Sequence, residues 1–269
     1  MTEAGSAELK QEALGNLLRA SAPLVIAYSG GVDSAYLLAV GAKTLGHDCL
    51  AVIADSPSLP RQALQDALRL ARQLPANVEV LTTEEMQNPD YTSNPINRCY
   101  FCKAELFTRL DALARDRGYR AVAYGENADD ASQVRPGRRA AAEFKVLAPL
   151  REVGLTKSEI RILSRALHLP NADAPAQPCL SSRIPHGTPV TAEALQMIER
   201  AEAVVRSFGF RVFRVRHHAK ECGVGARLEI LPNEMPKLAN VRAALVSGVQ
   251  AVGYGEVVVA PRGYAASSA

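Results

Sequence analysis

Residues 24–34 decide the fold of this chain, and they read Leu24-Val25-Ile26-Ala27-Tyr28-Ser29-Gly30-Gly31-Val32-Asp33-Ser34. The first five residues form an apolar run typical of a buried strand, and two glycines follow shortly after it. The Ala-rich stretch 34–45 then predicts a helix. Glycines let backbone N–H groups approach an anion closely, and a helix N-terminus adds partial positive charge. This order therefore predicts an anion-binding loop between a strand and a helix.

The loop carries side chains that suit a phosphate. The hydroxyls of Ser29 and Ser34 can donate hydrogen bonds to phosphate oxygens, and Asp33 can orient the loop or help to hold Mg²⁺. An ordinary glycine-rich turn is the alternative. The loop is not a Walker A loop, because the lysine of that motif is absent. The string SGGVDS resembles instead the signature of the PP-loop ATP pyrophosphatases, which implies that ATP is cleaved between its α- and β-phosphates and that a substrate is adenylated.

Strands and helices alternate on both sides of this loop. We expect strands at 24–28, 50–54, 78–81 and 120–124, and helices at 8–20, 34–45, 61–74 and 102–117. This alternation predicts a doubly wound, parallel α/β sheet, which the PP-loop resemblance places in the adenine nucleotide alpha hydrolase-like class. We therefore expect a PP-loop domain over residues 1–186.

The regular alternation of strands and helices ends near residue 154. Thr156 and Glu159 have capping-box spacing, which predicts a helix that reaches about residue 167. After a proline-rich loop at 170–189, the order is helix 192–207, strand 210–216, strand 226–231, helix 234–246 and strand 251–260. We expect residues 187–269 to form a small α+β domain.

Composition and charge limit the kinds of partner that this chain is expected to bind. The chain has 269 residues, of which 48% are hydrophobic and 22% charged, as in an ordinary globular protein. Its net charge is +3 and its pI about 8.6, short of the value above about 9 that marks nucleic-acid binders. No apolar run approaches the roughly 20 residues that span a bilayer, and the N-terminus shows no secretory pattern. We expect a cytoplasmic protein with neither a nucleic acid nor a membrane as its partner.

Polar residues follow the fourth expected strand. Gly125, Asn127, Asp129 and Asp130 lie where ligands bind in an open parallel sheet, at the carboxyl ends of the strands. They can cap the next helix, or they can contact Mg²⁺ or a substrate beside the phosphate loop. Arg135, Arg138 and Arg139 follow, either as a solvated basic surface or as a site for a small anion.

The cysteines indicate metal or redox chemistry. The chain has five, Cys49, Cys99, Cys102, Cys179 and Cys222, and an odd number argues against a disulfide framework. The C-x-x-C pair of Cys99 and Cys102 suits zinc, an iron–sulfur cluster or redox thiols, while Cys49 is typical of a core residue. No second C-x-x-C pair exists for zinc. Three thiolates from Cys99, Cys102 and Cys179 could hold a 4Fe–4S cluster and leave one iron open.

Several longer motifs resemble the LarE-type sulfurtransferases. They are SGGVDS, Asp55-Ser-Pro-Ser-Leu-Pro60, Asn97-Arg-Cys-Tyr-Phe-Cys-Lys103, Asn127-Ala-Asp-Asp130, Arg135-Pro-Gly137, Ala148-Pro-Leu150, Gly154-Leu-Thr-Lys157 and Pro178-Cys-Leu-Ser-Ser-Arg-Ile-Pro185. The resemblance implies adenylation of pyridinium-3,5-biscarboxylic acid mononucleotide and its conversion to thiocarboxylates, a step in making the nickel-pincer nucleotide. One branch of the family sacrifices the cysteine that matches Cys179. With Cys99, Cys102 and Cys179 all present, this chain resembles the other branch, which is thought to deliver sulfide from a 4Fe–4S cluster.

The resemblance also implies roles for particular residues. ATP would be bound by Ser29, Gly30, Gly31, Asp33, Ser34, Ser56 and Gly125. The nucleotide substrate would contact Asn127, Asp130, Ser182, Arg183, Arg214, Arg216 and Glu229, of which the arginines suit its carboxylates. Mg²⁺ would take Asp33 and Asp129, and the family implies a homo-hexamer.

Three readings compete with sulfide delivery from a cluster. Cys179 could be a sacrificial sulfur donor for the same substrate. The chain could instead be a PP-loop tRNA thiolase, which its modest charge disfavours, or a non-catalytic sensor of adenine nucleotides.

Overall fold

The computed structural model of the chain describes residues 3–132, 136–220, 223–261 and 263–264. Arg135 and Cys222, which the sequence analysis singles out, lie outside these ranges.

Contacts divide the chain into two compact units. The first contains Met1–Ser56, Arg61–Glu85 and Asn97–Gln177, and the second contains Pro57–Pro60, Met86–Ile96 and Pro178–Ala269. The division reflects contacts and not independent folding, so the domain boundary at residues 186 and 187 stays a prediction.

The first unit is built on a four-stranded, all-parallel sheet in the order β3-β2-β1-β4. Its strands are β1 (Leu24–Ala27), β2 (Cys49–Asp55), β3 (Asn77–Thr82) and β4 (Ala121–Tyr124). In the register, Val25 of β1 pairs with Leu50 of β2 and with Val122 of β4. The expected parallel α/β sheet is confirmed.

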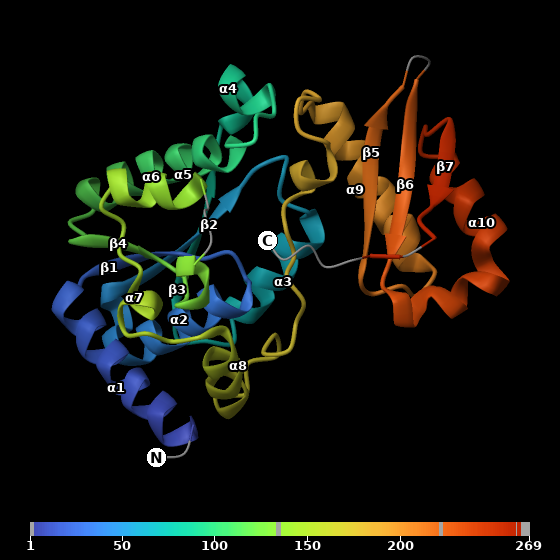
Figure 1. The fold of residues 1–269 in the computed structure, drawn as a ribbon. Coiled ribbons are helices and arrows are strands. Elements are labelled where there is room, and N and C mark those ends of the chain that lie inside the picture. The colour runs from blue at the N-terminus through green and yellow to red at the C-terminus, as the bar shows by residue number, and fades with distance from the viewer. Residues whose placement is uncertain (1–2, 133–135, 221–222, 262, 265–269) are drawn as a thin grey trace. The chain divides into compact units, whose positions relative to one another are not determined.

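Helices cover both faces of this sheet (Figure 1). One face carries α5 (Arg98–Asp116) and α6 (Pro136–Glu143), and the other carries α1 (Glu3–Ser21), α2 (Val32–Leu45) and α8 (Lys157–Ala166). Val25 packs in the core under α5, whereas the next residue, Ile26, faces Gly41 of α2, where an added Cβ would lie 2.9 Å from the Ile26 Cδ1. Because neighbouring residues of β1 are buried on opposite faces, the strand reads as a continuous apolar run.

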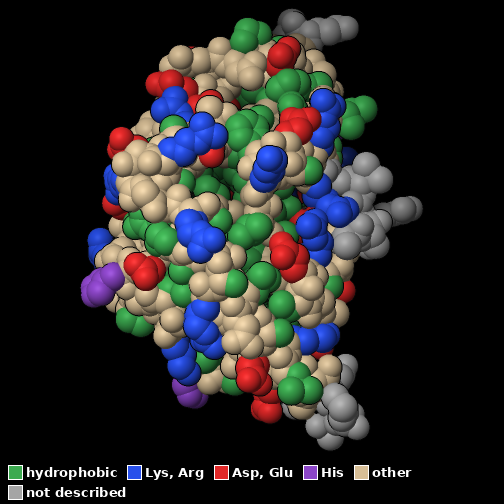
Figure 2. Space-filling view, turned by 90° about the vertical axis from the view of Figure 1, so that its left-hand side faces the viewer, with side chains coloured by type: hydrophobic (Ala, Val, Ile, Leu, Met, Phe, Trp, Pro, Cys, Tyr) green, Lys and Arg blue, Asp and Glu red, His purple; other side chains and the backbone are tan. Residues whose placement is uncertain are grey.

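The remaining short helices are α3 (Arg61–Ala71) and α7 (Pro149–Glu152) in the first unit and α4 (Pro89–Thr92) in the second. None of the described helices combines the length and apolar character needed to cross a membrane. Lys and Arg side chains lie among Asp and Glu side chains on the face shown in Figure 2, so that face carries mixed charge.

The second unit has a three-stranded sheet in the order β5-β6-β7. Its strands are β5 (Phe213–Ala219), β6 (Val224–Ile230) and β7 (Glu256–Val259); the first pair is antiparallel and the second parallel. Its long helices are α9 (Ala192–Ser207) and α10 (Leu238–Gln250), and residues of both share a buried core with the sheet. The expected small α+β fold is confirmed.

The first strand of this unit begins later than expected. The sequence predicts a strand from residue 210. In the structure, the N–H groups of Arg211 and Val212 instead donate to a carboxylate oxygen of Glu234, each over 3.0 Å. These donors are therefore not available to a neighbouring strand, and β5 starts at Phe213. Likewise, the expected strand at 251–260 shrinks to Glu256–Val259 because a turn at Gly253, with φ +124°, follows α10.

Candidate active site

The loop after β1 has a shape that only glycine permits at one position. Gly30 has φ +77°, and a Cβ added there would lie 2.6 Å from the Cβ of Ala67 in α3. At Gly31, the nearest atom of the described residues beyond its chain neighbours is the Ser29 Oγ, 3.5 Å from an added Cβ. Gly31 is the N-cap of α2 and gives the helix no side-chain cap. A helix start without such a cap can accept an anion in its place.

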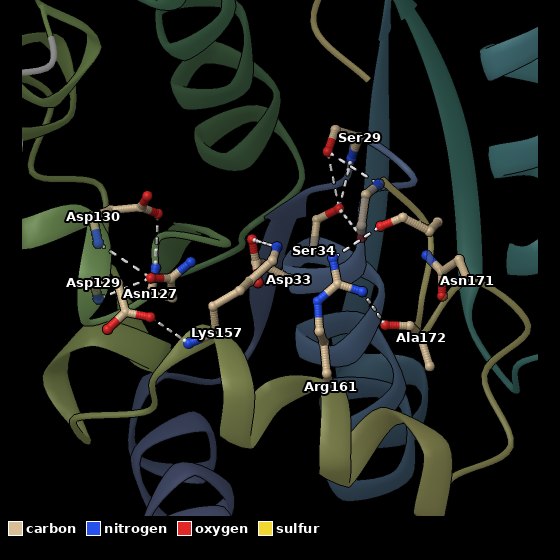
Figure 3. A network of polar contacts seen from close by, with 12 residues as sticks. Ser29, Asp33, Ser34, Asn127, Asp129, Asp130, Lys157, Arg161, Asn171 and Ala172 are labelled. Carbon is tan, nitrogen blue, oxygen red and sulfur yellow. Dashed lines mark hydrogen bonds and ion pairs between the residues drawn. The ribbon is translucent and has the colours of Figure 1, made fainter. Parts of the chain in front are cut away.

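Two hydroxyls brace the loop from within (Figure 3). The Ser34 Oγ lies 3.0 Å from the Ser29 Oγ and donates to the Gly31 carbonyl over 3.1 Å. The Ser29 N–H donates to the Ser34 Oγ over 3.2 Å. Both predicted phosphate donors thus belong to one hydrogen-bonded ring around the loop.

Asp33 lies in the first turn of α2, and its two carboxylate oxygens have different surroundings. Its Oδ2 accepts a 2.6 Å hydrogen bond from the Nζ of Lys157 at the start of α8. Its Oδ1 is buried and has no hydrogen-bond partner among the described residues. A buried carboxylate oxygen without a partner is costly, which fits a position that a cation occupies in the loaded protein.

The segment after β4 meets this loop, as the sheet order predicts. A Cβ added at Gly125 would lie 2.8 Å from the backbone N of Ser34, so Gly125 allows the two backbones to approach. Its observed role is close packing, and its predicted contact with ATP stays a prediction.

Asn127 and Asp129 are engaged with backbone N–H groups. The Asn127 Oδ1 accepts from the N–H groups of Asp129 and Asp130 over 2.9 and 3.2 Å. The Asp129 Oδ2 accepts the Lys157 N–H over 2.8 Å. These are capping contacts, one of the two roles that the sequence leaves open for this segment. Of the two carboxylates predicted to bind Mg²⁺, Asp33 therefore has the buried oxygen without a partner.

A third segment holds the loop and was not identified from the sequence. Asn171, beyond the end of α8, donates from its Nδ2 to the Gly30 carbonyl over 2.9 Å. Arg161 of α8 fixes that segment by donating to the carbonyls of Ala172 and Ala174 over 2.7 and 3.0 Å. Figure 3 shows these residues on one side of Ser34, with the Lys157–Asp33 pair on the other. No local motif marks Asn171, because its partner lies 141 residues earlier.

The arginines after β4 make internal ion pairs. Glu126 is buried, and its carboxylate pairs with Arg138 at 2.8 Å and with Arg151 at 2.7 Å. The Tyr124 hydroxyl donates to the same carboxylate. Arg139 binds Glu143 at 2.8 Å on the surface of α6. Arg138 thus pairs with a buried carboxylate. This ion pair was not among the two alternatives predicted for Arg138, a solvated basic surface or a site for a small anion.

Cys99 and Cys102 both lie on α5, because the helix begins at Arg98 and not at residue 102 as expected. Cys99 is exposed and Cys102 half-buried. A spacing of three residues puts both thiols on one face of the first helical turns, where the helix N-terminus favours a thiolate. Cys49 is different, because burial raises the pKa of its thiol to about 12. Cys49 is therefore a protonated core residue, as predicted.

Ser56 directly follows β2 and is buried. Its carbonyl accepts from Arg61 over 2.7 Å, and Arg61 also pairs with Asp55 at 2.6 Å. The Ser56 backbone is thereby fixed at the carboxyl end of the sheet. Its predicted contact with ATP stays a prediction.

Cys179 belongs to the second unit and starts a short 3-10 turn, Leu180–Arg183. It is half-buried, and its carbonyl accepts from the Ser182 Oγ over 2.7 Å and from the Arg183 Nη1 over 3.0 Å. Arg183 is only 3% exposed. It also pairs with Glu202 of α9 at 2.8 Å through its Nε. In this conformation Arg183 and Ser182 hold the cysteine loop, and their predicted substrate contacts stay predictions.

Two further arginines line the same side of the second unit. The Arg216 Nη1 donates to the Ser182 carbonyl over 2.8 Å, and its Nε donates to Glu229 over 3.0 Å. Arg214 is buried, and burial together with the charge of Arg183 lowers the pKa of its guanidinium. The structure thus brings Ser182, Arg183, Arg214, Arg216 and Glu229 into one region next to Cys179. Guanidinium groups suit an anionic ligand, and in this conformation Arg183 and Arg216 are paired with Glu202 and Glu229.

The described residues contain no group of three or more His, Cys, Asp or Glu side chains arranged to hold a metal ion. The iron–sulfur assignment of Cys99, Cys102 and Cys179 and the Mg²⁺ assignment of Asp33 and Asp129 remain predictions.

Comparison with known proteins identifies relatives of this chain. It is 43% identical over 234 residues to an uncharacterized protein of Synechocystis sp., covering 87% of this chain and 82% of that protein. It is 33% identical over 196 residues to the pyridinium-3,5-bisthiocarboxylic acid mononucleotide synthase of Lactiplantibacillus plantarum, covering 72% of this chain and 71% of the synthase. An uncharacterized protein of Methanocaldococcus jannaschii is 26% identical over 236 residues. No protein-family model matches the chain.

The named relative matches most of the chain. An identity of 33% over 72% of this chain is too extensive for a shared loop motif alone. The agreement with the motifs quoted above points the same way. The chain belongs to the LarE family, the family of that synthase.

Proposed function

We propose that this chain is an ATP-dependent sulfurtransferase that acts on pyridinium-3,5-biscarboxylic acid mononucleotide in nickel-pincer nucleotide biosynthesis. It adenylates a substrate carboxylate, releases pyrophosphate and then forms a thiocarboxylate. The relative named as the bisthiocarboxylic acid mononucleotide synthase supports the substrate class. The observation that carries the ATP step is the loop at Gly30 and Gly31, which opens α2 without a side-chain cap.

The residues of the first unit divide the adenylation step among them. The N–H groups at the start of α2 would bind the β- and γ-phosphates, and the hydroxyls of Ser29 and Ser34 keep the loop in shape. Asp33 would hold Mg²⁺ through its buried Oδ1. Mg²⁺ would offset the negative charge that develops on the departing pyrophosphate. A substrate carboxylate oxygen attacks the α-phosphorus, and the electron pair of the broken bond leaves with pyrophosphate.

Sulfur transfer uses the cysteines. We propose that Cys99, Cys102 and Cys179 hold a 4Fe–4S cluster. The two thiols of α5 share one face at a helix N-terminus, and the loop that carries Cys179 is held by Arg183, which donates to the Cys179 carbonyl. Such a cluster would supply sulfide from the iron that no protein thiolate binds. Sulfide attacks the activated carbonyl carbon, and AMP leaves with the bonding electrons.

Pyrophosphate release tests the ATP step. Purified protein is incubated with Mg·ATP, with and without the biscarboxylic mononucleotide, and pyrophosphate and AMP are measured. We expect both products only with the substrate. Nucleotide binding without substrate-dependent pyrophosphate would favour the sensor. Pyrophosphate release stimulated by tRNA, with the salt dependence of a polyanion contact, would favour the tRNA thiolase.

The sulfur source needs a separate measurement. After anaerobic purification, iron and acid-labile sulfide are quantified, and Cys179 is examined by mass spectrometry before and after turnover. We expect about four irons per chain and an unchanged Cys179. Iron-free protein in which Cys179 loses the mass of its thiol would establish sacrifice instead. Cys99→Ala and Cys102→Ala should each lower the iron content, whereas Cys49→Ala should not.

A further inference from the structure

The ion pair between Lys157 and Asp33 joins the phosphate loop to a helix far away in sequence. The Lys157 Nζ lies 2.6 Å from the Asp33 Oδ2 across a separation of 124 residues. Figure 3 shows the two side chains pointing toward each other from α8 and α2. The loop itself contains no lysine, although the comparable Walker A loop carries one that reaches the phosphates.

The Lys157 side chain is not needed to hold its own helix in place. The start of α8 is fixed by the Lys157 N–H, which donates to Asp129. It is also fixed by the capping box of Thr156 and Glu159, and Glu159 in turn pairs with Lys10 at 2.7 Å. The Lys157 side chain is still 37% exposed. Its ammonium group is therefore anchored at the base and can move at the tip.

Asp33 can exchange this partner for another cation. It pairs with Lys157 through Oδ2, while its Oδ1 is buried without a partner among the described residues. A divalent cation on this carboxylate would weaken its attraction for an ammonium group. Asp33 would then release Lys157 at the moment when Mg·ATP brings negative charge to the same loop.

Two other cations of the described part of the chain, Arg161 and Arg61, have partners elsewhere. The Arg161 guanidinium donates to the carbonyls of Ala172 and Ala174. Arg61 pairs with Asp55 and donates to the Ser56 carbonyl. Of these three cations, Lys157 is the one that pairs with the loop's own carboxylate, and its side chain is partly exposed.

We propose that Lys157 is a catalytic residue that moves from Asp33 to a phosphate oxygen of bound ATP. This inference rests on the proposed adenylation and adds a residue to it. As the substrate carboxylate attacks the α-phosphorus, charge accumulates on the α-phosphate and the leaving pyrophosphate. The Lys157 ammonium donates hydrogen bonds to those oxygens and keeps its protons throughout. The bond between the α-phosphorus and the bridging oxygen breaks toward pyrophosphate, so no proton transfer is required.

Three variants test the role. Lys157→Met removes the charge and keeps the length, Lys157→Arg keeps the charge, and Lys43→Gln is a control that removes an exposed lysine from the last turn of α2. Removing one preorganised donor from a developing charge typically lowers kcat about 10²–10³-fold. We expect Lys157→Met to lower kcat for substrate-dependent pyrophosphate release by about 100-fold, Lys157→Arg to recover at least a tenth of the activity, and Lys43→Gln to match wild type.

A spectroscopic readout follows the ammonium group directly. Reductive ¹³C-methylation keeps the positive charge of lysine and gives each side chain an NMR signal, and the signal lost in Lys157→Arg is that of Lys157. We expect this signal to shift when Mg²⁺ and a non-cleavable α,β-methylene analogue of ATP are added, whereas the Lys43 signal stays in place.

The outcomes separate this inference from the proposed function. If wild type releases pyrophosphate and Lys157→Met does so at the same rate, or if the Lys157 signal does not respond to the ATP analogue, Lys157 is a structural partner of Asp33 and the inference is wrong. If wild type releases no pyrophosphate with the substrate but the Lys157 signal responds, the proposed function fails and the phosphate contact stands. Thermal unfolding of each variant identifies any loss that comes from misfolding.

Discussion

Replacing Gly30 by alanine should disable the phosphate loop through a single contact. Gly30 has φ +77°, and the added Cβ would lie 2.6 Å from the Ala67 Cβ and 3.2 Å from the Ala67 Cα. Real Cβ atoms do not approach another carbon as closely as 2.6 Å. Either the loop or α3 must therefore move, and movement of the loop displaces the N–H groups proposed to bind phosphate.

Two costs contribute to the magnitude. A non-glycine residue in the left-handed region costs about 1–2 kcal/mol. Overpacking in a well-packed region costs about 1–3 kcal/mol more. Gly118 separates the two costs, because it has φ +75° and, its chain neighbours apart, none of the described residues has an atom within 4 Å of an added Cβ. We expect Gly118→Ala to be destabilised only by the backbone conformation and Gly30→Ala by both effects. The free energies of unfolding of the two variants should therefore differ by about 1–3 kcal/mol.

Urea unfolding gives the two stabilities, and calorimetric titration with Mg·ATP gives the affinities. We expect Gly118→Ala to bind ATP like wild type and Gly30→Ala to bind at least ten times more weakly. Adding Ala67→Gly to Gly30→Ala removes the closest contact, at a cost of about 1 kcal/mol for glycine within α3. The double variant should recover part of the lost affinity.

A Gly30→Ala protein that equals Gly118→Ala in stability and binds ATP normally would contradict this prediction. The prediction would also fail if Ala67→Gly changed the affinity equally in the presence and absence of Gly30→Ala. That result would mean that the two positions are not coupled.

Three further predictions concern the rest of the chain. Glu202→Gln leaves the buried guanidinium of Arg183 without its ionic partner, so we expect a loss of about 3–5 kcal/mol in urea unfolding. Burial raises the pKa of Glu234, but hydrogen bonds from two backbone N–H groups and a lysine outweigh it and place the pKa below the ordinary 4.5. The stability that Glu234 contributes should therefore be complete above pH 4.5 and decline as the pH falls through its lowered pKa, so the difference between wild type and Glu234→Gln should shrink at low pH. Gly125→Ala should weaken ATP binding with little change in α-helix content by circular dichroism, because its Cβ would lie 2.8 Å from the Ser34 N.

Much of the first unit could be predicted from sequence because its signals are local. The two central strands β1 and β2 are buried on both faces and so form continuous apolar runs, at residues 24–28 and 50–54. The capping box of Thr156 and Glu159 is likewise a short-range pattern, and both of its hydrogen bonds form. Such features depend on residues a few positions apart.

Contacts between distant residues could not be predicted in the same way. The start of β5 is set by Glu234, which takes the N–H groups of Arg211 and Val212 from more than 20 residues away. The burial of Arg183 against Glu202 was also missed, because an arginine after a cysteine reads equally well as a ligand for a carboxylate substrate. In both cases a charged side chain satisfies an internal partner that periodicity does not reveal.

The conformation of the phosphate loop depends both on a local sequence motif and on contacts with distant residues. Its motif is short, yet three separate segments fix its conformation: α3 excludes a side chain at Gly30, Asn171 holds the Gly30 carbonyl, and Gly125 lets β4 approach Ser34. Each of these contacts constrains a different backbone atom, so none can replace another. A loop fixed in this way presents its N–H groups without first having to be ordered, so the proposed binding of phosphate would cost less conformational entropy. The glycines are required because the surrounding fold leaves space for backbone alone.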